Sequence, residues 1–220
     1  MKSLVFDFLE QLQVNNNREW FQIEKNAFEI AKKEANTAFL EIDAQLRKQD
    51  SIERTQIFRI YRDVRFSKNK APYKNHFSVG FTRTKPLLRG GYYLHIEPNA
   101  SFVGGGFWEP NAADLNRIRK EFEVDDEEIR KIISDVTFKK FFGELKGDEL
   151  KTAPKGFDKL HPAIDLIRKK QFLLNRSFSN EEVLAANFNQ EVLVTFQAMR
   201  PFFDYMSDVL STDLNGESIY

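Results

Sequence analysis

Charged and aromatic side chains alternate along residues 57–66, which read IFRIYRDVRF. In a β-strand, residues two positions apart project from the same face. On such a strand, one face would carry Arg59, Tyr61, Asp63 and Arg65. Because a guanidinium group can bind a phosphate or a carboxylate through two parallel hydrogen bonds, the pattern predicts an anion-binding surface in which Tyr61 is an aromatic contact.

A second segment, GYYLHIEP at residues 91–98, places Tyr93, His95 and Glu97 on one face by the same rule. Imidazole titrates near neutral pH, so a histidine beside a carboxylate can act as a general acid or base. If the two strands are neighbours, His95 can work with Glu97 or with Asp63. We therefore predict His95, Glu97 and Asp63 as catalytic residues, with Tyr93 as a further aromatic contact.

Three more cations extend the predicted anion site. Arg62 falls on the apolar face of the 57–66 segment, where an unpaired charge is costly, so it must have a partner, reach solvent or bind a ligand. Lys68 and Lys74 lie on the loop that follows and can attract an anion. The predicted anion-binding set is Arg59, Arg62, Arg65, Lys68 and Lys74. A competing interpretation is that these charges form cross-strand ion pairs on a solvated sheet face.

Three consecutive glycines, Gly104, Gly105 and Gly106, lack the side chains that would keep a ligand away from the backbone. Their amide groups could contact an anion. However, the run has neither the spacing of a P-loop nor that of a dinucleotide-binding motif. A bulge or a close crossing of strands is the favoured interpretation.

The sequence identifies no cofactor. It contains no cysteine, which excludes disulfides, thiol nucleophiles and cysteine-bound metals, and it has no HExxH or EF-hand motif. Asp63, His95 and Glu97 could together hold Mn²⁺, Fe²⁺ or Zn²⁺. We rank such a divalent metal well below the anion site and predict no metal-binding residues. We expect His76 and His161 to be structural histidines.

Charge is distributed unevenly along the chain. The 33 Lys and Arg residues balance the 33 Asp and Glu residues, so the formal net charge is zero. Between Arg54 and Arg89, however, 10 cations face a single acid, Asp63, which gives this segment a net charge of +9. A neutral total therefore does not exclude an anionic partner, because the sum hides a basic segment.

Two kinds of periodicity indicate the elements that must position these residues. Apolar residues recur at helical spacing over 3–13 and 18–47, and again from residue 180 onward, where Pro201 should kink or interrupt the helix. Short strands rich in Phe, Tyr, Val and Ile alternate with turns over residues 55–106, and a later strand is expected near 171–178. We predict one α+β domain over residues 1–212, with an antiparallel sheet, helices packed on one of its faces, and a frayed tail at 213–220.

Residues that can cap helices mark three of the expected helix starts. Ser179 is followed three residues later by Glu182, Asn16 by Glu19, and Asp125 by Glu128. Each pair matches the capping box, in which the two side chains satisfy backbone N–H groups of the first helical turn. We therefore predict a capping box at all three positions.

Several motifs resemble those of one family. They are FRIYRDVRFSK at 58–68, PYK at 72–74, GYYLHIEP at 91–98, FVGGG at 102–106, PKGF at 154–157 and HP at 161–162. On these motifs the chain resembles the uncharacterised family catalogued as domain of unknown function 2461, and the resemblance covers nearly the whole chain. It implies a single-domain soluble protein and supplies no activity, substrate or catalytic residue.

We expect a small anionic ligand, a phosphate or a carboxylate, as the partner of an enzyme-like pocket on the sheet. Two alternatives stay open. One is a nucleic-acid-binding module whose basic segment 54–89 follows phosphates while tyrosines stack on bases, and the other is a non-catalytic protein-interaction domain. No stretch approaches the roughly 18 apolar residues of a membrane-spanning helix, so we expect a cytoplasmic protein without a membrane partner.

Overall fold

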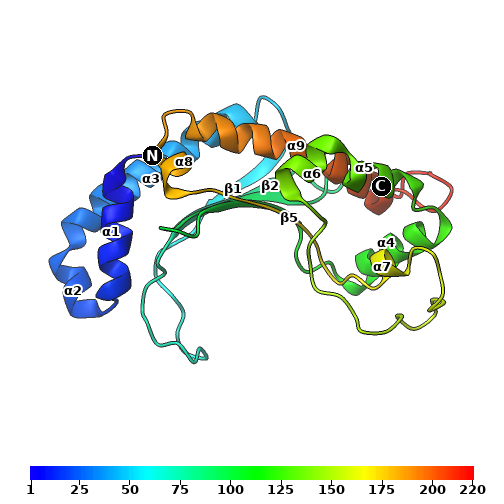
Figure 1. The fold of residues 1–220 in the computed structure, drawn as a ribbon, viewed down its shortest axis with the longest axis horizontal. Helices are drawn as coiled ribbons and strands as arrows, with labels where there is room; N and C mark the ends of the chain where they lie inside the picture. The colour runs from blue at the N-terminus through cyan, green and yellow to red at the C-terminus, as the bar shows by residue number, and fades with distance from the viewer.

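The fold is a five-stranded antiparallel sheet with helices over one of its faces. In the computed structural model, which describes residues 1–220, the strands follow one another across the sheet in chain order: β1 (Ile52–Ile57), β2 (Phe77–Arg83), β3 (Gly91–Ile96), β4 (Phe102–Phe107) and β5 (Phe172–Ser177). Two long helices, α3 (Lys25–Leu46) and α9 (Phe188–Ser211), lie over the arched sheet, and no helix crosses the middle of its other face (Figure 1). The predicted α+β architecture is confirmed, as is the strand near residues 171–178.

The shorter helices gather at the two ends of the sheet (Figure 1). They are α1 (Ser3–Val14), α2 (Arg18–Ile23), α4 (Ala112–Val124), α5 (Glu127–Ser134), α6 (Val136–Phe142), α7 (Ile164–Ile167) and α8 (Asn180–Leu184). Helices α1 and α2 pack against α3, whereas α4, α5 and α6 pack against α9. None of the helices is both long and apolar enough to cross a membrane.

Side chains of the inner strands alternate between the helices and the opposite side. On β2, Phe77, Val79 and Phe81 are buried beneath the helices, and the ring of Phe81 packs on Phe196 of α9 at 5.7 Å. Because alternate residues of a strand point to opposite faces, Gly80 of the same strand faces away from α9. We call the sheet face opposite α3 and α9 the open face.

The first strand does not lie where the alternation in residues 57–66 placed it. Strand β1 ends at Ile57, and residues 58–76 form a long loop that leaves the sheet on the side of the open face (Figure 1). The two arms of this loop pair with each other through their backbones. The Arg62 amide donates to the Pro72 carbonyl at 2.9 Å, and the Lys74 amide donates to the Ile60 carbonyl at 2.8 Å. The prediction of a strand over 57–66 is therefore wrong, because the alternation belongs to a loop that folds on itself.

Each of two predicted long helices is divided into two by a turn, and the last helix continues through its proline. The helix expected over 18–47 breaks at Glu24 into α2 and α3, and the one expected from residue 180 breaks between α8 and α9. Helix α9 continues through Pro201, although proline removes one backbone donor. The adjoining Phe202 and Phe203 are fully buried, and this burial offsets the lost hydrogen bond.

One of the three predicted capping boxes is confirmed. The box predicted at Asp125 and Glu128 is wrong, because the residue before α5 is Asp126 and its side chain makes no capping hydrogen bond. Ser179 and Glu182 form the reciprocal hydrogen bonds of a capping box at the start of α8. At the start of α2, however, Asn17 rather than Asn16 caps the helix, because the Asn17 carbonyl oxygen accepts a hydrogen bond from the Trp20 amide at 2.8 Å. Asn16 is thus free to bond elsewhere.

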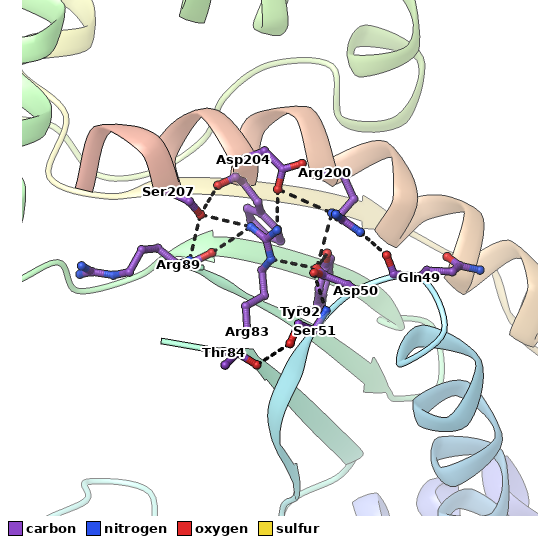
Figure 2. Close-up of polar contacts among 11 residues, drawn as sticks. Gln49, Asp50, Ser51, Arg83, Thr84, Arg89, Tyr92, Arg200, Asp204 and Ser207 are labelled. Atoms are coloured by element: carbon purple, nitrogen blue, oxygen red, sulfur yellow. Dashed lines mark hydrogen bonds and ion pairs between the residues drawn. The ribbon is translucent and has the colours of Figure 1, made fainter. Parts of the chain in front are cut away.

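A buried ion-pair network lies between the sheet and α9 (Figure 2). Arg83 of β2 has no exposed surface and lies 2.8 Å from Asp50 and 2.5 Å from Asp204 of α9. Tyr92 of β3 donates a 2.5 Å hydrogen bond to Asp50. Nearby, Arg89 pairs with Asp114. Two cations of the basic segment 54–89 are therefore neutralised by acids from other parts of the chain.

Replacing Arg83 with alanine should lower the free energy of unfolding by about 3–5 kcal/mol, because buried Asp50 would lose its nearest charged partner and keep only Arg200, at 3.5 Å. Chemical denaturation followed by circular dichroism measures the change. The control is Arg65→Ala, which breaks an exposed pair with Asp63 and should leave the denaturation midpoint unchanged. A wild-type midpoint for Arg83→Ala would contradict this role.

Candidate functional site

Two histidines and a glutamate meet where β2 begins and β3 ends. Phe77 pairs with Ile96 across these strands, so the next pair outward is His76 and Glu97, while His95 lies opposite Ser78. The centroids of the two imidazole rings are 4.0 Å apart. One side-chain nitrogen or oxygen atom from each of His76, His95 and Glu97 lies within 4.8 Å of the other two. We call these three residues the histidine cluster.

A chain of hydrogen bonds fixes His95 and Glu97. The Tyr93 hydroxyl lies 3.2 Å from His95 Nδ1, and His95 Nε2 lies 2.7 Å from Glu97 Oε2. Because a carboxylate can only accept, Nε2 carries the proton and Nδ1 accepts from Tyr93. Phe102 stacks on the His95 ring with centroids 4.8 Å apart. The Ser101 hydroxyl bonds both backbone groups of Glu97, which holds the turn that carries the carboxylate.

Both histidines are neutral near pH 7. Burial, together with the smaller effects of His95, Lys74 and Arg62, lowers the pKa of His76 to about 3. Burial also lowers the pKa of His95, although Glu97 acts in the opposite direction. Each neutral imidazole has one unprotonated ring nitrogen, which can accept a proton or bind a cation; in His95 this nitrogen is Nδ1, which accepts from Tyr93.

A pocket of about 600 Å³ opens beside His95 on the open face. We call it the glycine pocket, because its floor is the Gly104–Gly106 run together with the flanking strands. Its walls include Tyr93, His95, Phe102, Trp108, Lys146 and Asn175. The wall residues come from β3, β4, β5 and two segments outside the sheet. The pocket therefore exists only once the sheet has formed.

The glycine run lies within β4 and pairs without a bulge, although Gly106 has a φ of +131°, which favours glycine. Gly104 pairs with Tyr93 of β3 on one side and with Asn175 of β5 on the other. The backbone of Gly104 and Gly105 pairs with neighbouring strands on both sides, so contact between these amides and an anion has little support. Because the glycines carry no side chains, the run makes the pocket deeper. A Cβ atom on Gly105 would lie 2.6 Å from Met199 Sδ and 2.9 Å from Phe203 Cζ. Glycine at that position allows α9 to pack closely on the sheet.

Asn16 ties the loop of residues 58–76 to the N-terminal helices. Its Nδ2 donates to the Tyr73 carbonyl at 3.1 Å and to Asn75 Oδ1 at 2.9 Å, and its Oδ1 accepts from the Tyr73 amide at 3.1 Å. The Tyr73 ring also stacks on Phe21 with centroids 3.9 Å apart. Because His76 follows directly along the chain, Asn16 is a positioning residue for the histidine cluster.

The structure brings together only part of the predicted site. Tyr93, His95 and Glu97 share the open face with the glycine run, and Lys74 and Arg62 lie close enough to His76 to lower its pKa. Neither Lys74 nor Arg62 forms an ion pair. Arg62 is half-buried and is not enclosed in the sheet, contrary to its expected place on an apolar strand face.

The expected alignment of Arg59, Tyr61, Asp63 and Arg65 is wrong, because the strand that would have aligned them ends at Ile57. Asp63 pairs with Arg65 at 2.6 Å in the exposed loop, so its carboxylate is not a partner of His95 or a member of a metal site with it. The side chains of Arg59 and Lys68 are exposed. Tyr61 bridges to Tyr73 across the loop and packs near the N-terminal helices.

Sequence reasoning missed His76, Asn16, Trp108 and Lys146. His76 precedes Ser78 by two positions, so strand alternation could have placed it on the face that carries His95. The other three had no local signal, because they reach the site from segments outside the sheet. The expected structural role of His161 is supported by its Nδ1, which accepts a hydrogen bond from the Ala163 amide at 3.1 Å.

A second depression of about 690 Å³ lies between α5 and residues 139–145. Four of its charged side chains form ion pairs, since Arg130 pairs with Asp126 at 2.6 Å and Lys131 pairs with Glu127 at 2.8 Å. It contains no histidine or tyrosine. The open face is therefore the stronger candidate for chemistry.

Gly104→Ala should fold as stably as the wild type, whereas Gly105→Ala should be destabilised by about 1–3 kcal/mol through overpacking against α9. A Cβ on Gly104 would make an ordinary 3.4 Å contact with the Phe102 ring, unlike the close contacts that a Cβ on Gly105 would make. Thermal denaturation of the two variants measures the difference. Equal melting temperatures would show that the faces of β4 are assigned wrongly.

Asn16→Ala should loosen the base of the 58–76 loop, since the Tyr73 amide and carbonyl lose their partner. Hydrogen exchange should accelerate at residues 72–76 and stay unchanged in β3 and β4. Asn15→Ala is the matched control, because the Asn15 side chain bonds only the Gln11 carbonyl of its own helix. Unchanged exchange at 72–76 in Asn16→Ala would remove its positioning role.

The sequence model of one family matches residues 4–205, and its description reads "Conserved hypothetical protein (DUF2461)". The matched range contains the whole sheet, the histidine cluster and the glycine pocket. Neither a curated protein nor a solved structure gives a significant match to the chain.

Proposed function

We propose that this chain, which belongs to the DUF2461 family of conserved hypothetical proteins, binds an organic anion on the open face of its sheet. The ligand class is a phosphate or a carboxylate attached to a planar apolar group. The observation that carries the proposal is the glycine pocket, which has an apolar floor and lies beside a set of unpaired cations. Different residues favour the apolar half and the anionic half of such a ligand.

The apolar half of the ligand is favoured by the floor and walls of the pocket. The Gly104–Gly106 run leaves the middle of the floor without side chains, while Phe102, Trp108 and Leu173 supply apolar surface around it. A volume of about 600 Å³ lies within the usual range for small-molecule sites. A flat ring can lie against such a floor and stack on the aromatic walls.

The anionic half is favoured by cations without acidic partners. Lys146 lines the pocket, and Lys74 and Arg62 border the histidine cluster. None of these three forms an ion pair, in contrast to Arg83 and Arg89 of the same basic segment. Burial and the charges of Arg59 and Arg62 lower the pKa of Lys74, so a bound anion would relieve repulsion there.

A ligand held between these groups would lie beside Tyr93 and His95, which both line the pocket. The hydrogen bond from His95 to Glu97 supports the predicted role of this pair in proton transfer. The alternative pairing of His95 with Asp63 has no support, since Asp63 bonds Arg65.

Phenyl phosphate should raise the melting temperature of the full chain at low salt in the presence of EDTA, whereas phenol should not. Lys74→Gln should weaken binding about tenfold or more, because a hydrogen bond to a charged group is lost. Gly104→Ala should also weaken it, because the new methyl group occupies the pocket floor. Isothermal titration calorimetry measures the affinities.

Lys85→Gln is the control, since this lysine is exposed on the turn between β2 and β3. It should bind phenyl phosphate like the wild type. The proposal fails if no aryl phosphate or aryl carboxylate stabilises the wild type, or if Lys74→Gln and Gly104→Ala bind equally well. If only a single-stranded oligonucleotide binds, with an affinity that falls steeply with salt, the nucleic-acid alternative replaces it.

A further inference from the structure

We propose that the histidine cluster binds one divalent first-row transition-metal ion through His76, His95 and Glu97. The three residues lie at adjacent positions of two hydrogen-bonded strands, and their donor atoms converge within 4.8 Å. This set replaces the one suggested by the sequence, because His76 occupies the place that Asp63 was expected to take. The site stands on this geometry alone and does not require the proposed anion binding.

The distances suit a shared ion. Metal–ligand bonds to imidazole nitrogen and carboxylate oxygen are about 2.0–2.2 Å, so two donors of one tetrahedral ion lie roughly 3.3–3.6 Å apart. Glu97 Oε2 lies 2.7 Å from His95 Nε2 and 4.0 Å from His76 Nδ1. The separation of His95 Nε2 and Glu97 Oε2 must open by at least about 0.6 Å, and the widest separation in the cluster, within 4.8 Å, must close by up to about 1.5 Å. Rotation of the His76 ring or the Glu97 carboxylate can supply that movement.

The donor set is also chemically suitable. Two neutral imidazoles and one carboxylate are the ligands of catalytic zinc sites and of non-haem Fe²⁺ sites, which keep coordination positions open for water or substrate. His95 lines the glycine pocket, so an open position here can face the pocket. A metal on His95 Nε2 would displace the proton that Nε2 donates to Glu97, and would therefore replace the proton-transfer role predicted for His95.

Outer contacts of the kind that orient metal ligands are already in place. The Tyr93 hydroxyl bonds Nδ1 of His95, which is the ring nitrogen that would not hold the metal. The Ser101 hydroxyl fixes the backbone of Glu97, and Asn16 fixes the chain just before His76. These contacts hold the ligands at the ends of two inner strands, where β2 begins and β3 ends.

The surrounding charge sets the conditions for binding. One ionised glutamate and two neutral histidines leave a bound dication with a net charge of +1, and Lys74 and Arg62 add repulsion. An anion next to the ion would offset this excess charge. Metal and anion should therefore strengthen each other's binding by the same factor. This coupling, unlike the metal site itself, rests on the proposed function.

The test is titration of the full, tag-free chain with Zn²⁺ by isothermal calorimetry after EDTA treatment and without added anion, followed by Co²⁺ absorption spectroscopy. We expect one ion per chain. His76→Gln, His95→Gln and Glu97→Gln should each weaken binding at least about tenfold. The chain has three histidines and no cysteine, so His161→Gln is a matched control that should bind like the wild type.

The inference is overturned if the wild type binds no stoichiometric Zn²⁺ tighter than about 100 µM, or if the double variant His76→Gln/His95→Gln binds as tightly as His161→Gln. Circular dichroism establishes folding, and Glu97→Gln decides the outcome if a histidine variant does not fold. Phenyl phosphate binding in EDTA reports the anion pocket alone, and Zn²⁺ binding without anion reports the metal site alone. Failure of either proposal is thus distinguishable from failure of the other.

Discussion

The buried pairing of Arg83 with Asp50 and Asp204 is the interaction on which the arrangement of the molecule depends. Arg83 points from β2 to one side of the sheet, where Asp50 follows α3 and Asp204 belongs to α9. A guanidinium without exposed surface must keep its acidic partners close, since an unpaired buried charge is very costly. Both long helices are therefore held on the same face, and the opposite face stays open for a ligand.

The open face acquires its chemistry from the same alternation that buries the other face. Tyr92 and Leu94 of β3 pack beneath α9, so Tyr93 and His95 necessarily point the other way. The glycine run serves both sides of β4, because Gly105 lets α9 approach the sheet while Gly104 leaves the pocket floor bare. The packing of α9 on one face of the sheet and the shape of the pocket on the other face therefore depend on the same strand residues.

Alternation in the sequence identified one half of the site and misled about the other. Tyr93, His95 and Glu97 were placed together because β3 is an inner strand with one buried and one open face. The segment 57–66 alternates just as clearly, but most of it forms a folded loop in which Ile60 is buried and Phe66 is exposed, while Tyr61 of the opposite set contacts Phe21 of α2. The sequence did not indicate the position of strand β1, because β1 is an edge strand with the polar sequence IERTQI. A period of two indicates that a segment has one polar and one apolar face. It does not indicate which elements pack against either face.

The sequence by itself determined the α+β class, the strands β2 to β5, the family resemblance and the shared face of Tyr93, His95 and Glu97. These features depend on local periodicity and on motifs that are continuous in the chain. Only the tertiary structure decided that His76 joins His95, that acids from distant segments neutralise Arg83 and Arg89, and that Lys146 and Trp108 reach the pocket. Such contacts depend on strand register and on the packing of segments far apart in sequence, and side-chain periodicity contains no information about either.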